Sequence, residues 1–477
     1  QRVLAGGADG LCQMTHFGFD LLKLVDPAGA RPLDAQRAGL TVAEAGAMLL
    51  LEAVDADAPP PSGALACLSG GGLSCDAHHA TAPHPEGDGA LAAMEAALMD
   101  AGLEPAQVDY VNLHGTGTPD NDRAEARAFR RLFGQQPPRL SSTKGVTGHP
   151  LAAAGALESV VAIDALCRQR APACAGLVNV DPDLGVEPLR ESEPMDLEHV
   201  LSNSFGFGGN NASLVWSQLG VSQKPLALRD EGLPWLFAHR AAAITGAGLL
   251  AESLDGLFAG EGCQGCFDGA ALLEGLPPRA QRRLKRVGRL ALGLERQLRP
   301  SPDEPPPERI FLGTAWGALG ETHDFLARLF SGSDRFSSPT DFVGSVHNAP
   351  AGMLALRQAA RGANLTLTGG NVSFEQALLA ASLLPTAEAE QITWLLGLDE
   401  GHPVLSPRLY ASVAQGASSL SDGAGGLALH VQAKGAVAAL RLLGMAEEDG
   451  SGVACLQTWL ADLPADAWFW LNIPAAE

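Results

Sequence analysis

From Gln1 to about Trp216, the chain alternates short apolar runs with longer segments rich in Ala and Leu. The runs VLAGGADG and VDYVNLHG have the composition of strands, and the second is followed by a Gly- and Thr-rich turn. The segments GALAAMEAALMDAGL (89–103) and LAAAGALESVVAIDAL (151–166) have the composition of helices. Strands that alternate with helices predict βαβ units and a largely parallel, buried sheet, so the fold class is α/β.

A polar stretch divides the chain. The alternation lapses into SQLGVSQKPLALRDEG, whose Pro and polar residues are typical of a linker. We therefore expect a first domain at 1–218, a linker at 219–232 and a second domain at 233–477. Two similar phrases, AGLTVAEAGAMLLLEAV (38–54) and ASSLSDGAGGLALHVQA (417–433), predict that the two domains are related modules in tandem.

Composition excludes several classes of function. The 477 residues include 32 Lys and Arg against 54 Asp and Glu, a formal net charge of −22, whereas a surface that binds nucleic acid is basic. The sequence has no charge-free apolar stretch of the roughly 18 residues that a membrane span needs, and no signal-like start. Eight cysteines are too few for a disulfide scaffold, and Cys263 and Cys266 form a CxxC without a second pair. We expect a cytoplasmic protein that binds no nucleic acid, membrane or metal.

Three phrases concentrate the residues that could carry chemistry. LHGTGTPDND places His114 just after a strand, with Thr116 and Thr118 in a glycine-rich turn. SSTKGVTGHP places Lys144 and His149 just before a long apolar helix. SNSFGFGGNN provides glycines that let backbone N–H groups approach a ligand closely. Imidazole N–H groups can hold a thioester or carboxylate oxygen and a glycine-rich loop can stabilise an oxyanion, so the three phrases favour carbonyl chemistry.

Each phrase alone also has a structural explanation. A histidine at a strand end can belong to the turn, and a lysine can solvate the start of a helix. GFGG lacks the G-x-G-x-x-G spacing and the acidic partner of a dinucleotide-binding loop, so a nucleotide-binding oxidoreductase is the weakest alternative. The combination and order of the phrases are more specific than any one of them.

In that order, HGTGT, STKGVTGH and NSFGFGGNN closely resemble the carboxyl-terminal half of the β-ketoacyl-acyl carrier protein synthases, the condensing enzymes of fatty acid and polyketide assembly. The resemblance extends from VLAGGADG to ASLVW (212–216). It implies a thiolase-like fold, layered αβαβα, and decarboxylative Claisen condensation of acyl and malonyl groups on an acyl carrier protein. A degradative thiolase is disfavoured, because thiolases pair two cysteines with one histidine.

The resemblance implies a catalytic role for four residues. His114 and His149 match the histidines that assist malonyl decarboxylation and hold the thioester carbonyl. Lys144 matches a lysine that organises the site electrostatically, and Glu158 matches a carboxylate near that lysine.

Four further residues are implied to contact the substrate. Thr116 and Thr118 match threonines that hydrogen-bond the pantetheine arm. Phe207 matches a gating phenylalanine whose backbone N–H belongs to the oxyanion hole, and Phe205 lies beside it. We expect no cofactor on the chain itself, because the phosphopantetheine arm is carried by the acyl carrier protein.

The nucleophile is the main departure from the family. The family's catalytic cysteine lies upstream of the phrase VLAGGADG, so its counterpart would precede Gln1. None of the eight cysteines lies in an ACSS-like turn, and a thiolate is required to take the acyl group from the carrier. The chain opens without Met, directly on a strand, so we expect the nucleophile on upstream residues outside this chain.

The second stretch resembles the amino-terminal half of the same family, though more loosely. AAITGAGLL resembles its opening strand, and PPRAQRRLKRVGRLAL resembles its basic helix. Placing NLTLTGGN over the nucleophile turn puts Asn371 at the cysteine position, and an amide cannot take up an acyl group. This module resembles the chain-length-factor subunits of type II polyketide and aryl polyene systems, which pair with a synthase and shape its acyl tunnel. The alternative is a decayed domain kept only for stability.

The resemblance also implies partners, namely an acyl carrier protein and a second synthase-like subunit in a homodimer or heterodimer. Carrier proteins are acidic and so is this chain, so docking needs local basic patches. Lys23 matches a carrier-contact position. Arg282 and Arg283 belong to a second candidate patch, for which a solvated basic helix face is the alternative.

Two functions remain open. In the first, the chain is a β-ketoacyl-ACP synthase of fatty acid, polyketide or aryl polyene synthesis, with a chain-length-factor-like second module. In the second, the chain is a non-catalytic partner subunit that shapes the acyl tunnel of a catalytic synthase. An upstream segment with an ACSS-type turn in the native polypeptide would favour the first.

Overall fold

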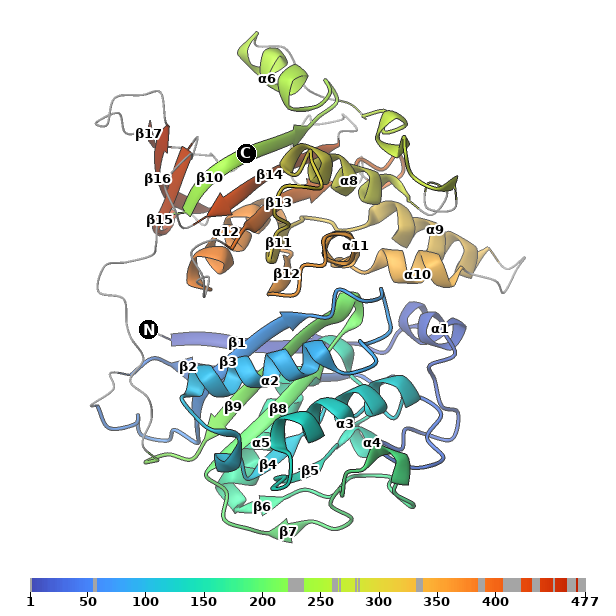
Figure 1. Cartoon of the computed structure of the whole chain (residues 1–477), viewed down its shortest axis with the longest axis vertical. Helices are drawn as coiled ribbons and strands as arrows, with labels where there is room; N and C mark the ends of the chain where they lie inside the picture. Colours follow the sequence, from blue (N-terminus) through green and yellow to red (C-terminus); the bar gives the residue numbers. More distant parts are fainter. Residues whose placement is uncertain are drawn as a thin grey trace. The chain divides into compact units, whose positions relative to one another are not determined.

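The computed structural model divides the chain into two compact units, Gln1–Ala227 (unit 1) and Leu228–Glu477 (unit 2) (Figure 1). The linker predicted at 219–232 lies mostly outside the residues that the structure describes. The described residues are 2–54, 58–221, 236–259, 265, 267–278, 281, 284–331, 338–384, 391–405, 422–430, 438–448, 451–460 and 469–470.

Unit 1 is built on a five-stranded sheet of β3 (Cys67–Cys75), β4 (Tyr110–Asn112), β5 (Arg139–Ser141), β8 (His199–Phe205) and β9 (Asn210–Ser217). The spatial order is β3-β9-β8-β4-β5. β4 pairs in parallel with β5 and with β8, whereas β9 pairs antiparallel with β8 and with β3.

The expectation of a largely parallel sheet is therefore wrong for unit 1. The reason is the connection between β8 and β9, which consists only of the glycine-rich turn 206–209. A turn this short joins antiparallel neighbours, because a parallel pair needs a crossover connection of a dozen residues or more. A buried strand has the same apolar composition in both arrangements, so the pattern of apolar runs does not separate them.

Three helices cover the two faces of this sheet: α2 (Asp88–Ala101), α3 (Pro119–Phe133) and α5 (Ala154–Arg168). Met94 of α2 and Phe129 of α3 share a buried cluster with Leu201 of β8. Leu166 of α5 belongs to a second cluster with Val200 of the same strand. Neighbouring strand residues point to opposite faces, so the two clusters form separate layers on either side of the sheet. α2 and α5 correspond to the two helices that the sequence pattern predicts.

Unit 1 also contains a separate antiparallel ribbon of β1 (Arg2–Asp9) and β2 (Ala45–Glu52). Between these two strands the chain forms α1 (Gln13–Leu21) and loops. Among the described residues, each strand of this ribbon pairs only with the other. Apolar side chains on one face of the ribbon are strongly exposed, with Leu4 at 66% and Leu50 at 67%, whereas Leu49 and Leu51 are partly buried against the core of unit 1.

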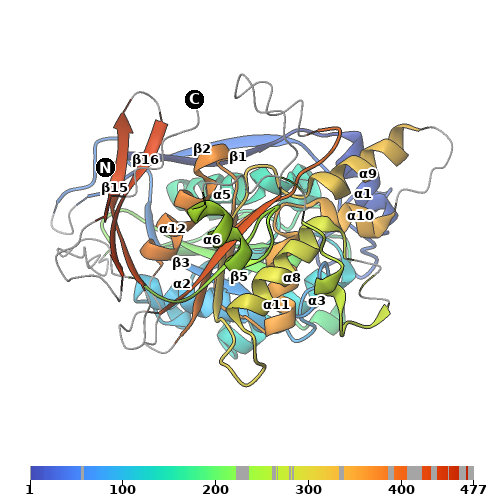
Figure 2. The same ribbon diagram turned by 90° about the horizontal axis from the view of Figure 1, so that it is seen from above.

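Unit 2 contains an eight-stranded sheet. In spatial order its strands are β12 (Asn364–Leu367), β11 (Arg309–Gly313), β13 (Thr393–Asp399), β14 (Gly423–His430), β10 (Leu236–Ile244), β15 (Ala438–Glu448), β16 (Ser451–Leu460) and β17 (Phe469–Trp470). β11 pairs in parallel with β12 and β13, and the other pairs are antiparallel. β15 and β16 form a hairpin at one end of this sheet (Figure 2).

The first five strands of unit 2 repeat the topology of unit 1. We number the five core strands of each unit in chain order, β3, β4, β5, β8 and β9 in unit 1 and β10 to β14 in unit 2. In both units the spatial order of these core strands is then third, second, fourth, fifth, first. In both, the second strand is parallel to the third and fourth, and the fifth is antiparallel to its two neighbours. The prediction of two related modules in tandem is confirmed. The two similar phrases do not lie at matching positions of this topology, because β2 belongs to the ribbon outside the core sheet of unit 1, whereas β14 is the fifth core strand of unit 2.

The helices of unit 2 pack on this shared core: α6 (Leu250–Phe258), α8 (Arg286–Leu298), α9 (Leu319–Phe330), α10 (Pro339–Ser345), α11 (Ala349–Gln358) and α12 (Ser373–Leu383). α8 packs on β10 and β14, α12 packs on β11, β12 and β13, and α9 and α10 pack on each other. Within the described ranges, no helix has the length and apolar content needed to cross a membrane.

Candidate active site

Lys144 lies at the centre of a buried polar cluster in unit 1. It is the first residue of α4 (Lys144–Thr147), and its side chain is 1% exposed. Its Nζ donates a hydrogen bond to the main-chain carbonyl of His114 at 2.6 Å and lies 3.4 Å from Nδ1 of that histidine. Nζ also forms an ion pair with Glu158 of α5. Lys144 therefore links the turn after β4, through His114, to helix α5, through Glu158.

The rings of His114 and His149 lie edge to face in this cluster. Their centroids are 5.2 Å apart with an interplanar angle of 81°. Burial, followed by the charge of Lys144, lowers the pKa of both histidines well below the usual value. Both rings are therefore neutral at neutral pH, and a neutral imidazole can donate one N–H to a carbonyl oxygen.

Glu158 supplies the charge that compensates Lys144. Its side chain is 3% exposed, and burial raises its pKa while the Lys144 ammonium lowers it. A buried ammonium and a buried carboxylate are stable only as a pair, since either one alone would carry the full cost of desolvation. The four residues predicted to be catalytic thus lie in one cluster.

A buried carboxylate that the motifs do not single out holds the turn after β4. Glu125 of α3 accepts hydrogen bonds from the backbone N–H groups of His114 and Gly115, both at 2.8 Å. It also accepts a hydrogen bond from Nδ2 of Asn203, on β8, at 3.1 Å. Burial raises the pKa of Glu125 to about 7. Glu125 fixes the backbone that presents His114.

One signal in the sequence could have identified Glu125. Asp122 and Glu125 lie three residues apart and so share one face of α3, the face that also carries the buried Phe129. Acidic side chains on the apolar face of a helix need buried partners, and the backbone N–H groups of the preceding turn are the nearest donors. Asp122 accepts the N–H of Gly117 in that turn at 3.1 Å.

Thr116 and Thr118 lie in the same turn. Their hydroxyl oxygens are 2.9 Å apart, and both residues are buried. Gly117, between them, has a φ of +82°, and a Cβ at this position would meet the carbonyl oxygen of Gly39 at 2.8 Å. The phrase HGTGT thus requires glycine here both for its backbone conformation and for its close packing.

The glycine-rich turn between β8 and β9 carries the two predicted phenylalanines. Phe205 ends β8, and its ring centroid is 5.7 Å from that of His114. Phe207 begins the turn, and its ring centroid is 5.4 Å from that of Phe19. Of the two rings, that of Phe205 packs against the histidine pair, while that of Phe207 packs against α1.

The buried cysteine Cys174 differs from an activated nucleophile. Burial raises the pKa of the Cys174 thiol to about 12, whereas a nucleophilic thiol needs a lowered pKa. The thiol of the buried Cys75 lies 3.5 Å from the carbonyl oxygen of Gly208. Cys263 and Cys266 lie outside the described residues. The cysteines described as free thiols are Cys12, Cys67, Cys75, Cys167 and Cys174.

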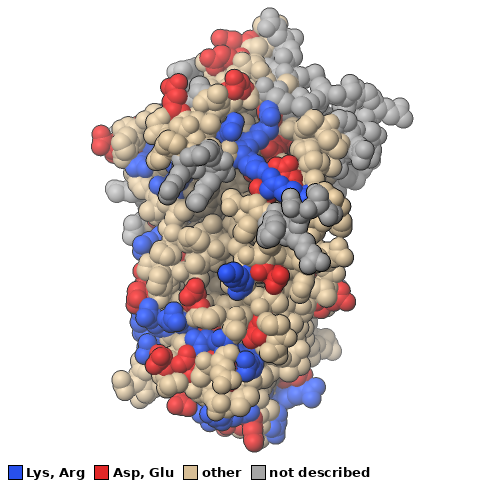
Figure 3. Space-filling view, turned by 90° about the vertical axis from the view of Figure 1, so that its right-hand side faces the viewer, with Lys and Arg blue, Asp and Glu red and all other residues tan. Residues whose placement is uncertain are grey.

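The predicted carrier-docking residues are only partly described. Lys23 follows α1 and is exposed. Arg282 and Arg283 lie outside the described residues. On the face shown in Figure 3, Lys and Arg side chains are interspersed with Asp and Glu. A docking role for these residues stays a prediction.

The basic run that contains Arg282 and Arg283 continues with two described cations, both of which are paired within unit 2. Lys285 forms an ion pair with Asp324 at 2.5 Å. Arg286 forms an ion pair at 2.8 Å with Asp422, whose side chain is 0% exposed. These two cations anchor α8 to its own unit.

Asn371 lies in the turn η6 (Gly370–Val372), between β12 and α12. Its side chain is not among those described. This turn follows the third core strand of unit 2, as Lys144 follows the third core strand of unit 1. The assignment of this position to a lost nucleophile stays a prediction.

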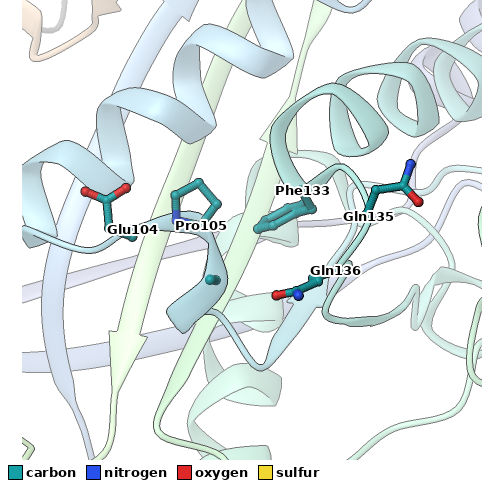
Figure 4. Close-up of a pocket in the computed structure, with 6 residues that line it drawn as sticks. Glu104, Pro105, Phe133, Gln135 and Gln136 are labelled. Carbon is teal, nitrogen blue, oxygen red and sulfur yellow. The ribbon is translucent and has the colours of Figure 1, made fainter.

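Metal-binding groups and surface pockets are two other kinds of candidate site. In the described part of the chain, no group of three or more His, Cys, Asp or Glu side chains is placed to hold a metal ion. A surface pocket of unit 1 lies between a short 3-10 turn and the end of α3 (Figure 4), away from the predicted site residues. It is lined by Glu104, Pro105, Ala106, Phe133, Gln135 and Gln136.

Comparison with known proteins gives matches in both units. Residues 65–177 match the family described as Beta-ketoacyl synthase, C-terminal domain, and residues 267–451 match Beta-ketoacyl synthase, N-terminal domain. The 3-oxoacyl-[acyl-carrier-protein] synthase 2 of Coxiella burnetii is 42% identical over 194 residues, which are 40% of this chain and 47% of that protein. The mitochondrial 3-oxoacyl-[acyl-carrier-protein] synthase of Arabidopsis thaliana is 42% identical over 196 residues, which are 40% of this chain and 42% of that protein. The chain spans about half the length of the curated relatives it matches.

A solved structure shares the fold over most of the chain. The PfaC Keto synthase-Chain length factor covers 92% of this chain and 57% of its own, with a TM-score of 0.74 and 18% identity. At that identity the likeness concerns the fold alone, and it agrees with the predicted thiolase-like α/β class. With a C-terminal domain in unit 1 followed by an N-terminal domain in unit 2, the chain belongs to the β-ketoacyl synthase family.

Proposed function

We propose that this chain is part of a β-ketoacyl-ACP synthase in which unit 1 supplies the site for decarboxylative condensation of acyl and malonyl groups. The observation that carries the proposal is the pair of neutral histidine rings, 5.2 Å apart, beside Lys144 and its partner Glu158. The names of the similar proteins, 3-oxoacyl-[acyl-carrier-protein] synthases, support the same assignment.

His114 and His149 are the groups proposed to act on the malonyl thioester. In the decarboxylation step the bond between the carboxylate carbon and Cα breaks, CO2 leaves, and the electron pair becomes an enolate with its charge on the thioester oxygen. Neutral imidazole N–H groups stabilise that oxygen as its charge develops. The enolate carbon then attacks the acyl thioester, the new carbon–carbon bond forms, and the nucleophile leaves as a thiolate.

Lys144 keeps the histidines in the neutral form that this step needs. Its buried ammonium, 3.4 Å from Nδ1 of His114, opposes protonation of both rings. Glu158 compensates the charge of Lys144, so the cluster is stable before the substrate arrives. The same fixed positive charge favours the negative charge that develops on the enolate.

The nucleophilic cysteine is proposed to lie outside these 477 residues. Acyl transfer from the carrier requires a thiolate, and the buried Cys174 has its pKa shifted in the opposite direction. An upstream segment of the native polypeptide is the proposed source of this cysteine.

The substrate is proposed to arrive on the phosphopantetheine arm of an acyl carrier protein. Thr116 and Thr118 are the proposed contacts of the arm, because hydroxyls can both donate to and accept from its amide groups. Phe207 is the proposed gate beside the oxyanion hole, and Phe205 packs against His114.

Carrier docking is assigned to Lys23 and to the pair Arg282 and Arg283. The exposure of Lys23 is compatible with contact to an acidic partner. The proposed setting is the cytoplasm, in fatty acid, polyketide or aryl polyene synthesis.

A second function, that of a non-catalytic partner subunit, is favoured by one feature of unit 2. Its turn after β12 carries Asn371 at the position where the resemblance expects a cysteine. In this alternative the chain pairs with a catalytic synthase, as a homodimer or heterodimer, and unit 2 shapes the acyl tunnel.

Release of CO2 from malonyl-loaded acyl carrier protein by the native polypeptide distinguishes the two functions. His149→Ala should lower the rate about 100-fold or more, because the loss of one hydrogen-bond donor to a developing oxyanion costs about 10²–10³ in rate. His16→Ala changes an exposed histidine outside the cluster and should keep the parental rate. A native protein without release above background, or near-normal release by a folded His149→Ala variant, would overturn the catalytic assignment.

A further inference from the structure

We propose that Arg37 is a positioning residue of this site. Acting through Asp122, it fixes the turn that carries Thr116 and Thr118, and thereby sets the affinity for the pantetheine-linked substrate. The inference rests on the proposed function, because it needs that turn to contact the substrate arm.

Arg37 is the charge partner of a fully buried carboxylate. The side chain of Asp122 is 0% exposed and that of Arg37 is 4% exposed, and Nε of Arg37 lies 3.6 Å from Oδ2 of Asp122. Burial raises the pKa of Asp122, and the N–H of Leu33 and the charge of Arg37 oppose that rise. Arg37 therefore helps to keep ionised a carboxylate whose charged form burial disfavours.

The ionised carboxylate of Asp122 joins two separate backbone segments. Oδ2 accepts the N–H of Leu33 at 2.9 Å, and Oδ1 accepts the N–H of Gly117 at 3.1 Å. Gly117 lies between Thr116 and Thr118, so the place of both hydroxyls depends on this hydrogen bond. A protonated carboxyl would hold the two N–H groups more weakly, since charge-assisted hydrogen bonds are about twice as strong as neutral ones.

The other segment held by Asp122 is strained. Leu33 is fully buried and has a φ of +62°, a region that bulky residues seldom occupy. Its carbonyl oxygen accepts the N–H of Asp181 at 3.0 Å, and Nη1 of Arg37 donates to the Asp181 carboxylate at 2.6 Å. Arg37 thus contacts both residues that hold Leu33 in place. Strain of this kind persists only where the surroundings over-determine the backbone, and it is concentrated at functional sites.

The test measures the dissociation constant of malonyl-pantetheine for the native polypeptide by calorimetry. Arg37→Met should raise the constant about tenfold, the scale on which remote residues act on a site. Arg37→Lys retains the charge beside Asp122 and should restore most of the affinity. Arg139→Met removes an exposed cation of unit 1 that pairs with Glu193 outside this network, so its constant should stay within about twofold of the parent.

A pH series separates positioning from a purely structural role. In Arg37→Met, the affinity for malonyl-pantetheine should improve as pH rises. Ionisation of Asp122 then restores the charge-assisted hydrogen bond from the N–H of Gly117, which Arg37 no longer supports. The parent also carries Glu125, which holds the neighbouring N–H groups of the same turn and whose pKa burial raises to about 7, so the test compares the pH dependence of Arg37→Met with that of the parent. If Arg37→Met does not fold, Asp122→Asn removes the carboxylate charge that holds the N–H of Gly117, with little change of volume, and should weaken binding by a similar factor.

The outcomes separate this inference from the proposed function. A folded native protein that binds no malonyl-pantetheine contradicts the proposed function itself. A parent that binds, together with Arg37→Met and Asp122→Asn variants whose affinity and pH profile equal those of the parent, overturns the role of Arg37 and leaves the proposed function standing.

Discussion

The two units place different chemistry at matching positions of the same sheet topology. After the second core strand, unit 1 continues into His114 and unit 2 into Thr314. After the third core strand, unit 1 continues into Lys144 and unit 2 into the turn of Asn371. The topology supplies the positions, and the side chains decide whether they can act on a carbonyl group.

In both units a carboxylate accepts hydrogen bonds from the backbone N–H groups of the loop after the second core strand, and this shared feature is structural. In unit 1, Glu125 holds the backbone N–H groups of the loop after the second core strand. In unit 2, Asp399 does the same, accepting the N–H groups of Ala315 and Trp316 at 3.0 Å. The carboxylate comes from the following helix in one unit and from a neighbouring strand in the other. Both loops need an anchor, so a buried carboxylate at this edge does not by itself indicate catalysis.

The largest expected effect breaks the charged pair that marks unit 1. Lys144→Met leaves Glu158 buried without its counter-charge and should cost about 3–5 kcal/mol of unfolding free energy. Adding Glu158→Gln should recover most of that loss, because no uncompensated charge remains. Denaturant unfolding of the parent, single and double variants measures both effects. A double variant as unstable as Lys144→Met would show that the two charges do not compensate each other.

The next prediction compares a buried strand of unit 2 with an exposed strand of unit 1. Leu395 of β13 is 0% exposed, whereas Leu4 of β1 is 66% exposed. Leu395→Ala should cost about 2–5 kcal/mol, and Leu4→Ala should stay within about 0.5 kcal/mol. Thermal and denaturant unfolding of the two variants makes the comparison. An equally large loss of stability in Leu4→Ala would show that the ribbon is covered in the native polypeptide.

The next prediction concerns the pH dependence of the unfolding free energy through a buried carboxyl group of unit 2. Glu321 is 6% exposed, and burial, followed by the charge of Glu400, raises its pKa from the usual 4.5 to about 7. A carboxyl with a raised folded-state pKa stabilises the fold fully below its unfolded pKa, and that stability is lost as pH rises through the folded pKa. Glu321→Gln should therefore raise stability at pH 8 by up to about 3 kcal/mol and change it little at pH 4. Unfolding curves at the two pH values decide, and an equal gain at both would contradict the assignment.

The smallest expected effect concerns the turn of unit 2. Asn371→Ala should change the condensation rate by less than about twofold, because an amide at this position cannot carry the acyl group. Steady-state rates of the native polypeptide with a carrier-bound substrate test this. A large loss in the folded variant would instead give unit 2 a direct catalytic part.

The catalytic cluster could be predicted from sequence because its members belong to short, distinctive phrases. His114, Lys144 and His149 follow strands within glycine-containing turns, and the carboxyl ends of the parallel strands β4 and β5 bring two of those turns together. The side chains that support them could not be found in this way. Arg37 reaches Asp122 across 85 positions of sequence, and no local pattern encodes a contact of that range.

The fold was predictable to the level of class and repetition. Apolar runs located β1, β4, α2 and α5, and the two similar phrases pointed to related modules. Strand direction was not predictable from apolar composition, because it depends on the length of the connection, as the short turn between β8 and β9 shows. Burial was not predictable for Leu4, because it depends on neighbouring strands rather than on the residue itself.

The central claim is that the histidines of unit 1 work with a cysteine outside these 477 residues. The most direct test treats the native polypeptide with a cerulenin-type thiol inhibitor and maps the adduct by peptide mass spectrometry. The account predicts one adduct, on a cysteine that is not among the eight of this chain. An adduct on one of those eight, or a native protein that takes up no inhibitor, would contradict it.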